Sequence, residues 1–108
     1  MFSRLRVLRE WRRFVEVVVE AVKRVEPEAR VYLVGGAAEG RLTVLSDIDV
    51  VVVLPRELGF EEAAELRARI WEEAEKLGLP LYAPIDLHIV SVEGLRKYVR
   101  RGRVVELG

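Results

Sequence analysis

The chain has 108 residues, of which 51% are apolar, and its 18 basic residues balance 18 acidic ones. This length predicts one domain with a real hydrophobic core, and the zero net charge provides no overall field to attract nucleic acid or a membrane surface. The chain has no cysteine, which excludes disulfides, thiolate nucleophiles and cysteine-bound zinc. Its apolar runs are far shorter than the roughly 20 residues that cross a bilayer, so no membrane span is expected.

The first predicted element is a helix from Ser3 to Val25, in which apolar residues recur every three to four positions. Phe14 and Val17 widen its apolar stripe. We expect the stripe to face the core, and its width leaves open a contact with another copy or with a partner. The charged, amphipathic character of this segment differs from that of a signal peptide, so we expect a cytoplasmic protein.

The chain contains neither asparagine nor glutamine and is rich in arginine and glutamate. Amides deamidate at high temperature, whereas networks of ion pairs gain value there, so this bias indicates a thermophilic source. It carries no information on the reaction.

Two buried strands are predicted, from Arg30 to Val34 and from Ile48 to Leu54, because both runs are apolar and rich in β-branched residues. The unbroken apolar character of the second run predicts a central strand covered on both faces. Asp47 and Asp49 flank Ile48, so their side chains point to the same face of that strand. Carboxylates so placed repel each other unless a cation separates them, and Mg²⁺ prefers such oxygen ligands.

Between these strands, from Gly35 to about Val44, the sequence predicts a turn and a short helix. The adjacent glycines Gly35 and Gly36 let the backbone turn sharply and let another molecule approach the amide groups. Such amides form an anion site that suits phosphate. Phosphate groups beside metal-binding carboxylates describe a site for a nucleoside triphosphate.

The rest of the chain alternates helix and strand, which predicts an α/β (α+β) fold. The predicted elements are a helix from Gly59 or Phe60 to Leu77, a strand from Ile85 to Val90, and a helix from Val92 to Arg101 that ends at Gly102. Two segments are ambiguous: Leu79–Tyr82 is a connector or a strand, and Arg103–Leu107 is a short strand or a docking tail. The helix that ends at Leu77 is expected to bury the side formed by Phe60, Ala63, Ala64, Ile70, Trp71, Ala74 and Leu77.

The glycine pair, ten further residues and then Asp47-x-Asp49 resemble the Gly-Ser-x10-Asp-x-Asp signature of the nucleotidyltransferase superfamily related to DNA polymerase β. The small size resembles its minimal nucleotidyltransferase branch. This resemblance implies a single such domain over residues 1–108, with a small mixed sheet of three or more strands flanked by helices. Further matches are Ala38, Gly40 and Ser46. Two positions depart from the family pattern, since Gly36 replaces its serine and Glu39 its arginine.

The resemblance also implies roles for individual residues. Asp47, Asp49 and Asp86 would be catalytic and would bind one or two Mg²⁺ ions, with Asp86 coming from the strand beside the Asp-x-Asp strand. Binding of ATP or another nucleoside triphosphate is implied for Gly35, Gly36, Gly40, Arg41 and Ser46. From the residues alone, Ser46 is expected to hydrogen-bond within the turn, and a salt bridge to an arginine is the alternative role of Asp86.

His88 and a basic cluster near the C-terminus are further candidates. His88 lies two residues past Asp86 on the same strand face, where hydrogen-bonded packing is expected and contact with substrate or metal is the alternative. The basic cluster consists of Arg96, Lys97, Arg100, Arg101 and Arg103, with Tyr98 among them. We expect these side chains to form a solvated face, because positive charges are favourable near the C-terminal end of a helix dipole. Contact with phosphate or RNA is the alternative.

Two functions are compatible with these features. The first is a Mg²⁺-dependent enzyme that transfers a nucleoside monophosphate, AMP from ATP in the leading case, to a hydroxyl group. Minimal members of the family that the chain resembles are commonly antitoxins paired with an all-helical HEPN-domain protein, which often supplies a tyrosine acceptor, so such a partner is implied. The second is a catalytically degenerate module that neutralises its partner by complex formation. Gly36 and Glu39 favour the second, and the three carboxylates favour the first. A third possibility is an ordinary α/β domain in which Asp-x-Asp occurs by chance. Assembly into a homo-oligomer is also possible.

Overall fold

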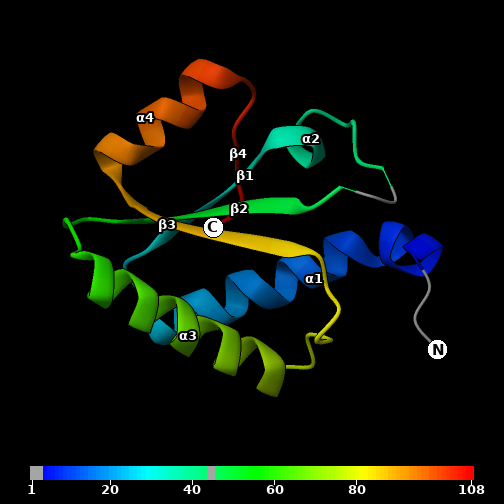
Figure 1. The fold of residues 1–108 in the computed structure, drawn as a ribbon, viewed down its shortest axis with the longest axis horizontal. Coiled ribbons are helices and arrows are strands. Elements are labelled where there is room, and N and C mark those ends of the chain that lie inside the picture. Colours follow the sequence, from blue (N-terminus) through cyan, green and yellow to red (C-terminus); the bar gives the residue numbers. More distant parts are fainter. Residues whose placement is uncertain (1–3, 44–45) are drawn as a thin grey trace.

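The computed structural model describes residues 4–43 and 46–108, with side chains from residue 9 onward (Figure 1). The predicted helix start at Ser3 and the predicted end of the glycine turn at Val44 lie outside the described residues. The elements are α1 (Arg4–Val25), β1 (Arg30–Val34), α2 (Gly35–Ala38), β2 (Ile48–Leu54), α3 (Phe60–Lys76), β3 (Ile85–Ser91), α4 (Val92–Arg101) and β4 (Val105–Glu106). The segment 79–82 forms a turn and not a strand, whereas the segment 103–107 contains β4.

The sheet is mixed, with the strand order β3-β2-β1-β4. β2 is parallel to β3 and antiparallel to β1, and β4 is antiparallel to β1. The mixed α/β architecture and the central position of β2 confirm the predicted fold class. Six of the seven residues of β2 are buried, as expected of a strand covered on both faces.

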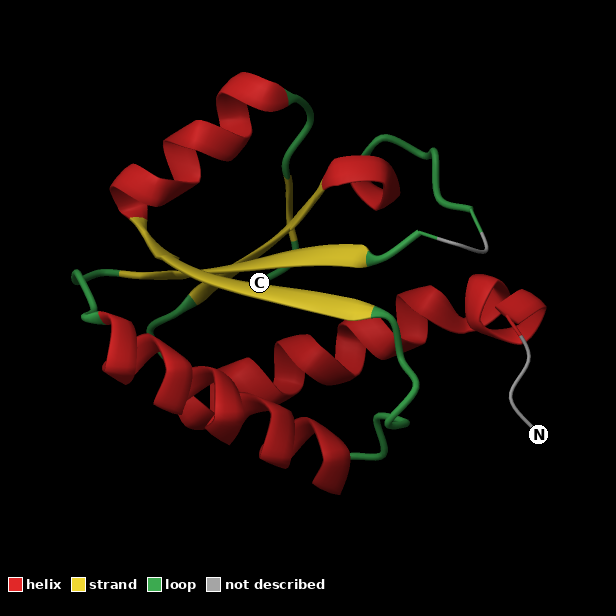
Figure 2. Cartoon of the chain, viewed as in Figure 1, coloured by secondary structure: helices red, strands yellow, loops and turns green. Residues whose placement is uncertain are grey.

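Helices cover both faces of the sheet (Figures 1 and 2). α1 and α3 pack against each other below the sheet in this view, and α4 and the short α2 lie above it. The side chains of β2 alternate between these layers. Val50 and Val52 face α1 and α3 within the main core, whereas Val51 and Val53 belong to a smaller apolar cluster that includes Tyr98 of α4. Asp49 therefore faces the α4 side of the sheet.

From Trp11 onward, the wide apolar stripe of α1 is covered by the protein's own core. Phe14, Val15, Val18 and Val22 are buried there, and Val17 packs against the same cluster. The expectation that this stripe faces the core is thereby confirmed for the part of α1 whose side chains the structure describes. No helix within the described residues combines the length and the apolar character that a membrane span requires.

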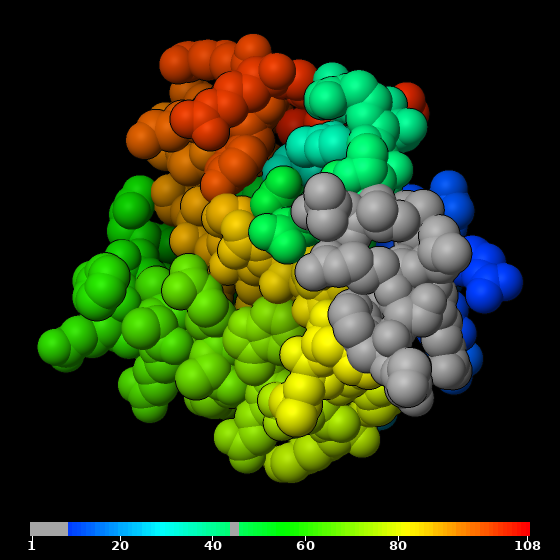
Figure 3. Space-filling view, turned by 45° about the vertical axis from the view of Figure 1, so that its right-hand side comes forward, coloured from blue at the N-terminus to red at the C-terminus, as the bar shows by residue number. Residues whose placement is uncertain are grey.

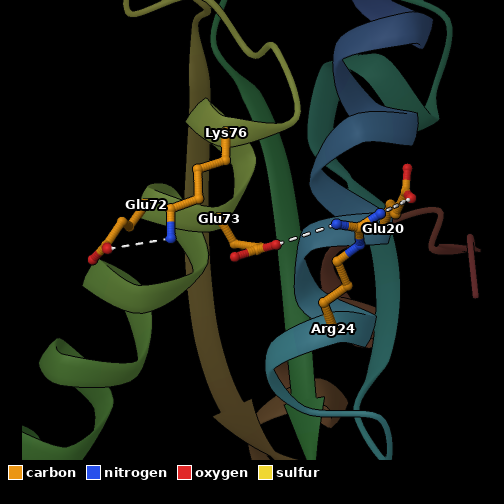
Figure 4. Close-up of polar contacts among 5 residues, drawn as sticks. All are labelled: Glu20, Arg24, Glu72, Glu73 and Lys76. Atoms are coloured by element: carbon orange, nitrogen blue, oxygen red, sulfur yellow. Dashed lines mark hydrogen bonds and ion pairs between the residues drawn. The ribbon is translucent and has the colours of Figure 1, made fainter.

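An ion-pair network joins α1 to α3 at the surface (Figure 4). The Arg24 guanidinium lies 2.9 Å from Glu20 on its own helix and 3.4 Å from Glu73 on α3. A separate pair on α3 joins Lys76 and Glu72 at 3.7 Å. Exposed pairs of this kind contribute about 0.2–1 kcal/mol each, so apolar packing is the main link between the two helices.

The predicted buried side of α3 was wrong at two positions. Phe60 is 90% exposed and Ala64 is also exposed, whereas Leu66 is buried. Leu66, Ile70 and Ala74 form the buried stripe at a spacing of four residues. Phe60 is the first residue of the helix and lies beyond the N-terminal end of this stripe. Trp71 is partly buried against the core, as expected.

The buried and the exposed side chains of α3 are expected to contribute differently to stability. Ile70→Ala removes a fully buried side chain, so we expect the free energy of unfolding to fall by about 2–5 kcal/mol. Phe60→Ala should change it by less than about 0.5 kcal/mol, because that ring is exposed. Urea denaturation followed by circular dichroism measures both values. A larger loss for Phe60→Ala than for Ile70→Ala would contradict the observed orientation of α3.

Candidate functional site

Asp49 and Asp86 lie side by side at one edge of the sheet. β2 and β3 are parallel and both start at this edge, and their register pairs Asp49 with Asp86. The Ile48 N–H donates a hydrogen bond to the Pro84 carbonyl at 2.7 Å, which holds the two strand starts together. Because both residues occupy the second position of their strands, their side chains point to the same face.

His88 lies beside both carboxylates. Its Nε2 atom is 3.4 Å from an oxygen of Asp49 and 3.3 Å from an oxygen of Asp86. The three side chains each offer one ligand atom, and these atoms all lie within 4.8 Å of one another. The side chains are partly accessible, with exposed fractions of 34% for Asp49, 54% for Asp86 and 32% for His88. His88 thus contacts the carboxylates directly.

These donors fit a divalent cation. Two carboxylates directly opposite each other on neighbouring strands repel, and a bound cation would remove that repulsion. Carboxylate oxygens suit Mg²⁺ or Mn²⁺, and imidazole is a further ligand for transition metals. Asp47, the other aspartate in the predicted set, is exposed in the loop just before β2 and is not in the cluster formed by the described residues. The structure therefore brings together two of the three predicted carboxylates, and adds His88.

Gly35 packs directly against one of the carboxylates. It follows β1, which pairs with β2 so that Val34 lies opposite Asp49. Gly35 has a φ of +70°, and a Cβ atom at this position would lie 2.7 Å from Oδ2 of Asp49. Both the backbone conformation and the close approach require glycine there. At Gly36 the nearest atom to a Cβ would be the Arg41 carbonyl oxygen at 3.7 Å, which leaves room for a small side chain.

The other predicted turn residues contact one another. A guanidinium nitrogen of Arg41 lies 2.7 Å from the Glu39 carboxylate, so the two charges offset each other. Gly40, between them, has a φ of +73°, as a tight turn requires. The Ser46 hydroxyl accepts a hydrogen bond from the Thr43 N–H at 3.0 Å, so this side chain stabilises the turn before β2.

A cleft of about 310 Å³ opens beside the Asp49 and His88 side chains. The α2 turn and the C-terminal end of α4 both line this cleft. The two segments lie side by side on the surface (Figure 3), with Gly102 against Glu39. The lining residues are Val34, Gly35, Glu39, Asp49, His88, Tyr98, Arg101, Gly102 and Arg103. Arg41 does not line it. The cleft therefore combines two acidic residues from the turn and sheet with two basic residues from the C-terminal segment.

Tyr98 lies near both His88 and Arg101. Its ring centroid is 5.9 Å from that of His88, and the Arg101 guanidinium lies 5.9 Å from the Tyr98 ring. Burial raises the pKa of the Tyr98 hydroxyl above its ordinary value; Arg101 opposes this shift, and Asp49 and Asp86 add to it. Tyr98 also lines the cleft, where its phenol can donate a hydrogen bond to a bound ligand.

From the sequence alone, we did not expect Tyr98, Arg101 and Arg103 at this site. One signal was available, since Tyr98 and Arg101 are three residues apart in a predicted helix and so lie on the same helix face. Which side of the sheet that face would cover depends on tertiary packing. The spacing alone could not place these residues beside Asp49.

Comparison with known proteins agrees with this fold. No curated protein sequence matches the chain significantly. Among solved structures, a candidate nucleotidyltransferase has 23% identity and a TM-score of 0.60, over 87% of this chain and 97% of its own. A candidate nucleotidyltransferase from Sulfolobus solfataricus has 16% identity and a TM-score of 0.64, over 98% of this chain and 87% of its own.

A third similar chain comes from the crystal structure of a toxin-antitoxin with AMP-PNP. It has 23% identity and a TM-score of 0.57, over 86% of this chain and 71% of its own. At these identities the likeness concerns the fold. The sequence model of the nucleotidyltransferase domain matches residues 15–106. Together with the sheet and the paired aspartates, this match shows that the chain belongs to the nucleotidyltransferase domain family.

Proposed function

We propose that this nucleotidyltransferase domain transfers a nucleoside monophosphate, AMP from ATP, to a hydroxyl group in a Mg²⁺-dependent reaction. The observation that carries the proposal is the pairing of Asp49 with Asp86 beside Gly35, at the edge of an open cleft. Two carboxylates that faced each other without a metal role would destabilise the sheet edge. Their presence next to a glycine turn supports a functional metal site rather than a structural one.

The proposed ligands are Asp49 and Asp86, with Asp47 as a third carboxylate. Asp47 lies two residues before Asp49, at the same edge of the sheet. Bound Mg²⁺ would orient the triphosphate and stabilise the charge that develops at the α-phosphorus. The turn from Gly35 to Gly40 would bring backbone amides close to the phosphates, because glycine leaves the backbone accessible.

The reaction forms one bond and breaks one. The acceptor hydroxyl oxygen bonds to the α-phosphorus, the bond from that phosphorus to the bridging oxygen of the β-phosphate breaks, and pyrophosphate leaves. Asp86 would take the hydroxyl proton, since it is the more exposed of the two paired carboxylates. His88 would hold both carboxylates in position through its contacts at 3.4 and 3.3 Å.

The acceptor is proposed to belong to a partner protein. The cleft lies on the surface of the domain, where a hydroxyl group of another molecule can reach it. The similarity to a chain of a toxin-antitoxin structure supports a protein partner. We propose a HEPN-domain protein in this role, with a tyrosine hydroxyl as acceptor, and an antitoxin function for this chain.

A catalytically degenerate binding module is the second candidate. It is favoured by Gly36, which lacks the hydroxyl of the family's serine, and by Glu39, which adds negative charge to the cleft. The pairing of Glu39 with Arg41 weakens the second objection to catalysis, because the turn then carries no net charge from these two residues. Absence of ATP binding would favour the binding module, whereas release of pyrophosphate from ATP would favour the enzyme.

The first prediction for this function concerns the paired carboxylates. Asp49→Asn and Asp86→Asn should each weaken binding of ATP with Mg²⁺ by at least about 100-fold, because each variant removes a charged metal ligand. Isothermal titration calorimetry measures the dissociation constant. Glu57→Gln, at an exposed glutamate outside the cleft, is the matched control and should bind like the wild type. Equal binding by wild type and both aspartate variants would refute the proposed site.

The second prediction compares the adjacent glycines. Gly36→Ser should leave stability within about 0.5 kcal/mol of the wild type, because the space beside Gly36 accepts a Cβ, and it should raise ATP affinity by restoring a hydroxyl. Gly35→Ala should lower the free energy of unfolding by about 1–3 kcal/mol, because alanine strains φ and meets Asp49. Thermal denaturation and ATP titration test both. A well-folded Gly35→Ala variant with unchanged ATP affinity would show that this contact is unimportant.

A further inference from the structure

The basic cluster near the C-terminus is divided between two sides of the molecule. Arg101 and Arg103 line the cleft beside Asp49. Arg96, Lys97 and Arg100 line a separate depression next to Glu57 and Glu93. Of this cluster, therefore, only Arg101 and Arg103 lie where they can contact a ligand bound at the cleft.

These two arginines share the cleft with the Glu39 carboxylate but are not paired with it. Within the part of the chain that the structure describes, neither Arg101 nor Arg103 forms an ion pair, whereas Arg41 is paired with Glu39 at 2.7 Å. The Arg101 guanidinium lies 5.9 Å from the centre of the Tyr98 ring. Both guanidinium groups are exposed and available to an anion.

The backbone holds this segment beside the glycine turn. Gly102 lies against Glu39, since a Cβ at Gly102 would be 3.4 Å from both carboxylate oxygens. β4 follows directly and pairs with β1, with Val105 opposite Leu33. The segment is thus fixed at both ends, by α4 on one side and by β4 on the other. Arg101 and Arg103 are thereby kept at the cleft, and not on a free C-terminal tail.

The charge balance of the cleft points to an anionic ligand. A divalent cation would neutralise Asp49 and Asp86, Arg41 already offsets Glu39, and Asp47 does not line the cleft. Two unpaired positive charges then remain in a cleft of about 310 Å³. Guanidinium groups bind phosphate through two parallel hydrogen bonds, which makes arginine well suited to a polyphosphate.

We infer that Arg101 and Arg103 bind the β- and γ-phosphates of the nucleoside triphosphate and supply the positive charge that the Glu39 turn lacks. This inference rests on the proposed function and assigns part of its substrate site to the segment between α4 and β4. The same contacts stabilise the charge of departing pyrophosphate, because that charge gathers on the phosphates that the arginines hold. Tyr98 lines the same side of the cleft.

Titration calorimetry with Mg²⁺ and either ATP or AMP tests the inference. Arg101→Ala and Arg103→Ala should each weaken ATP binding by about tenfold, and Arg101→Lys should weaken it less because the charge is kept. AMP, which lacks the β- and γ-phosphates, should bind all three variants within about twofold of wild type. Arg100→Ala is the matched control, since it removes the same charge from the same helix outside the cleft, and it should bind ATP like wild type. Circular dichroism checks that every variant is folded.

Failure of the inference and failure of the proposed function give different results. Wild-type ATP affinity in Arg101→Ala and Arg103→Ala, together with loss of ATP binding in Asp49→Asn, would overturn the inference and leave the proposed function intact. An equal loss in Arg100→Ala would also overturn it, because the effect would then be general electrostatic attraction. No ATP binding by the wild type would refute the proposed function and the inference together.

Discussion

The site depends on the parallel pairing of β2 with β3, which places Asp49 opposite Asp86. Parallel strands that start at the same edge bring residues at equal positions side by side, so a shift by one residue would turn one carboxylate to the other face. Such a shift in β2 would turn Asp49 toward the main core, where Ile48, Val50 and Val52 are buried and an unpaired carboxylate is costly. The apolar packing of the sheet thus fixes the geometry of its polar edge.

The remaining parts of the site are arranged around this pair. On one side Gly35 brings the backbone against the Asp49 carboxylate, in a conformation that other residues adopt only with strain. On the other side α4 and β4 hold a segment with two unpaired arginines over the same cleft. His88 lies between the carboxylates and Tyr98. The cleft therefore has a carboxylate side and a guanidinium side, and a metal-bound polyphosphate is complementary to both.

The local elements could be predicted from the sequence, and their long-range arrangement could be predicted only in part. The runs Arg30–Val34 and Ile48–Leu54 are strands because apolar, β-branched residues dominate them, and Asp86 was expected on the strand beside Asp49. The buried side of α3 could be predicted only in part, because alanines fit either side of a helix. Phe60, which was expected on the buried side, is exposed. The positions of Arg101 and Arg103 depend on β4, a strand of two residues whose pairing with β1 has no pattern in the sequence.

The most direct test of the metal site is a crystal structure of the protein with Mn²⁺ and a non-hydrolysable ATP analogue, with the anomalous signal of manganese measured. If the proposed site is right, an anomalous peak will lie within about 2.0–2.6 Å of carboxylate oxygens of both Asp49 and Asp86, with the analogue's phosphates bound to the ion. An analogue bound elsewhere, or no manganese between these two residues at saturating concentrations, would contradict the proposed site.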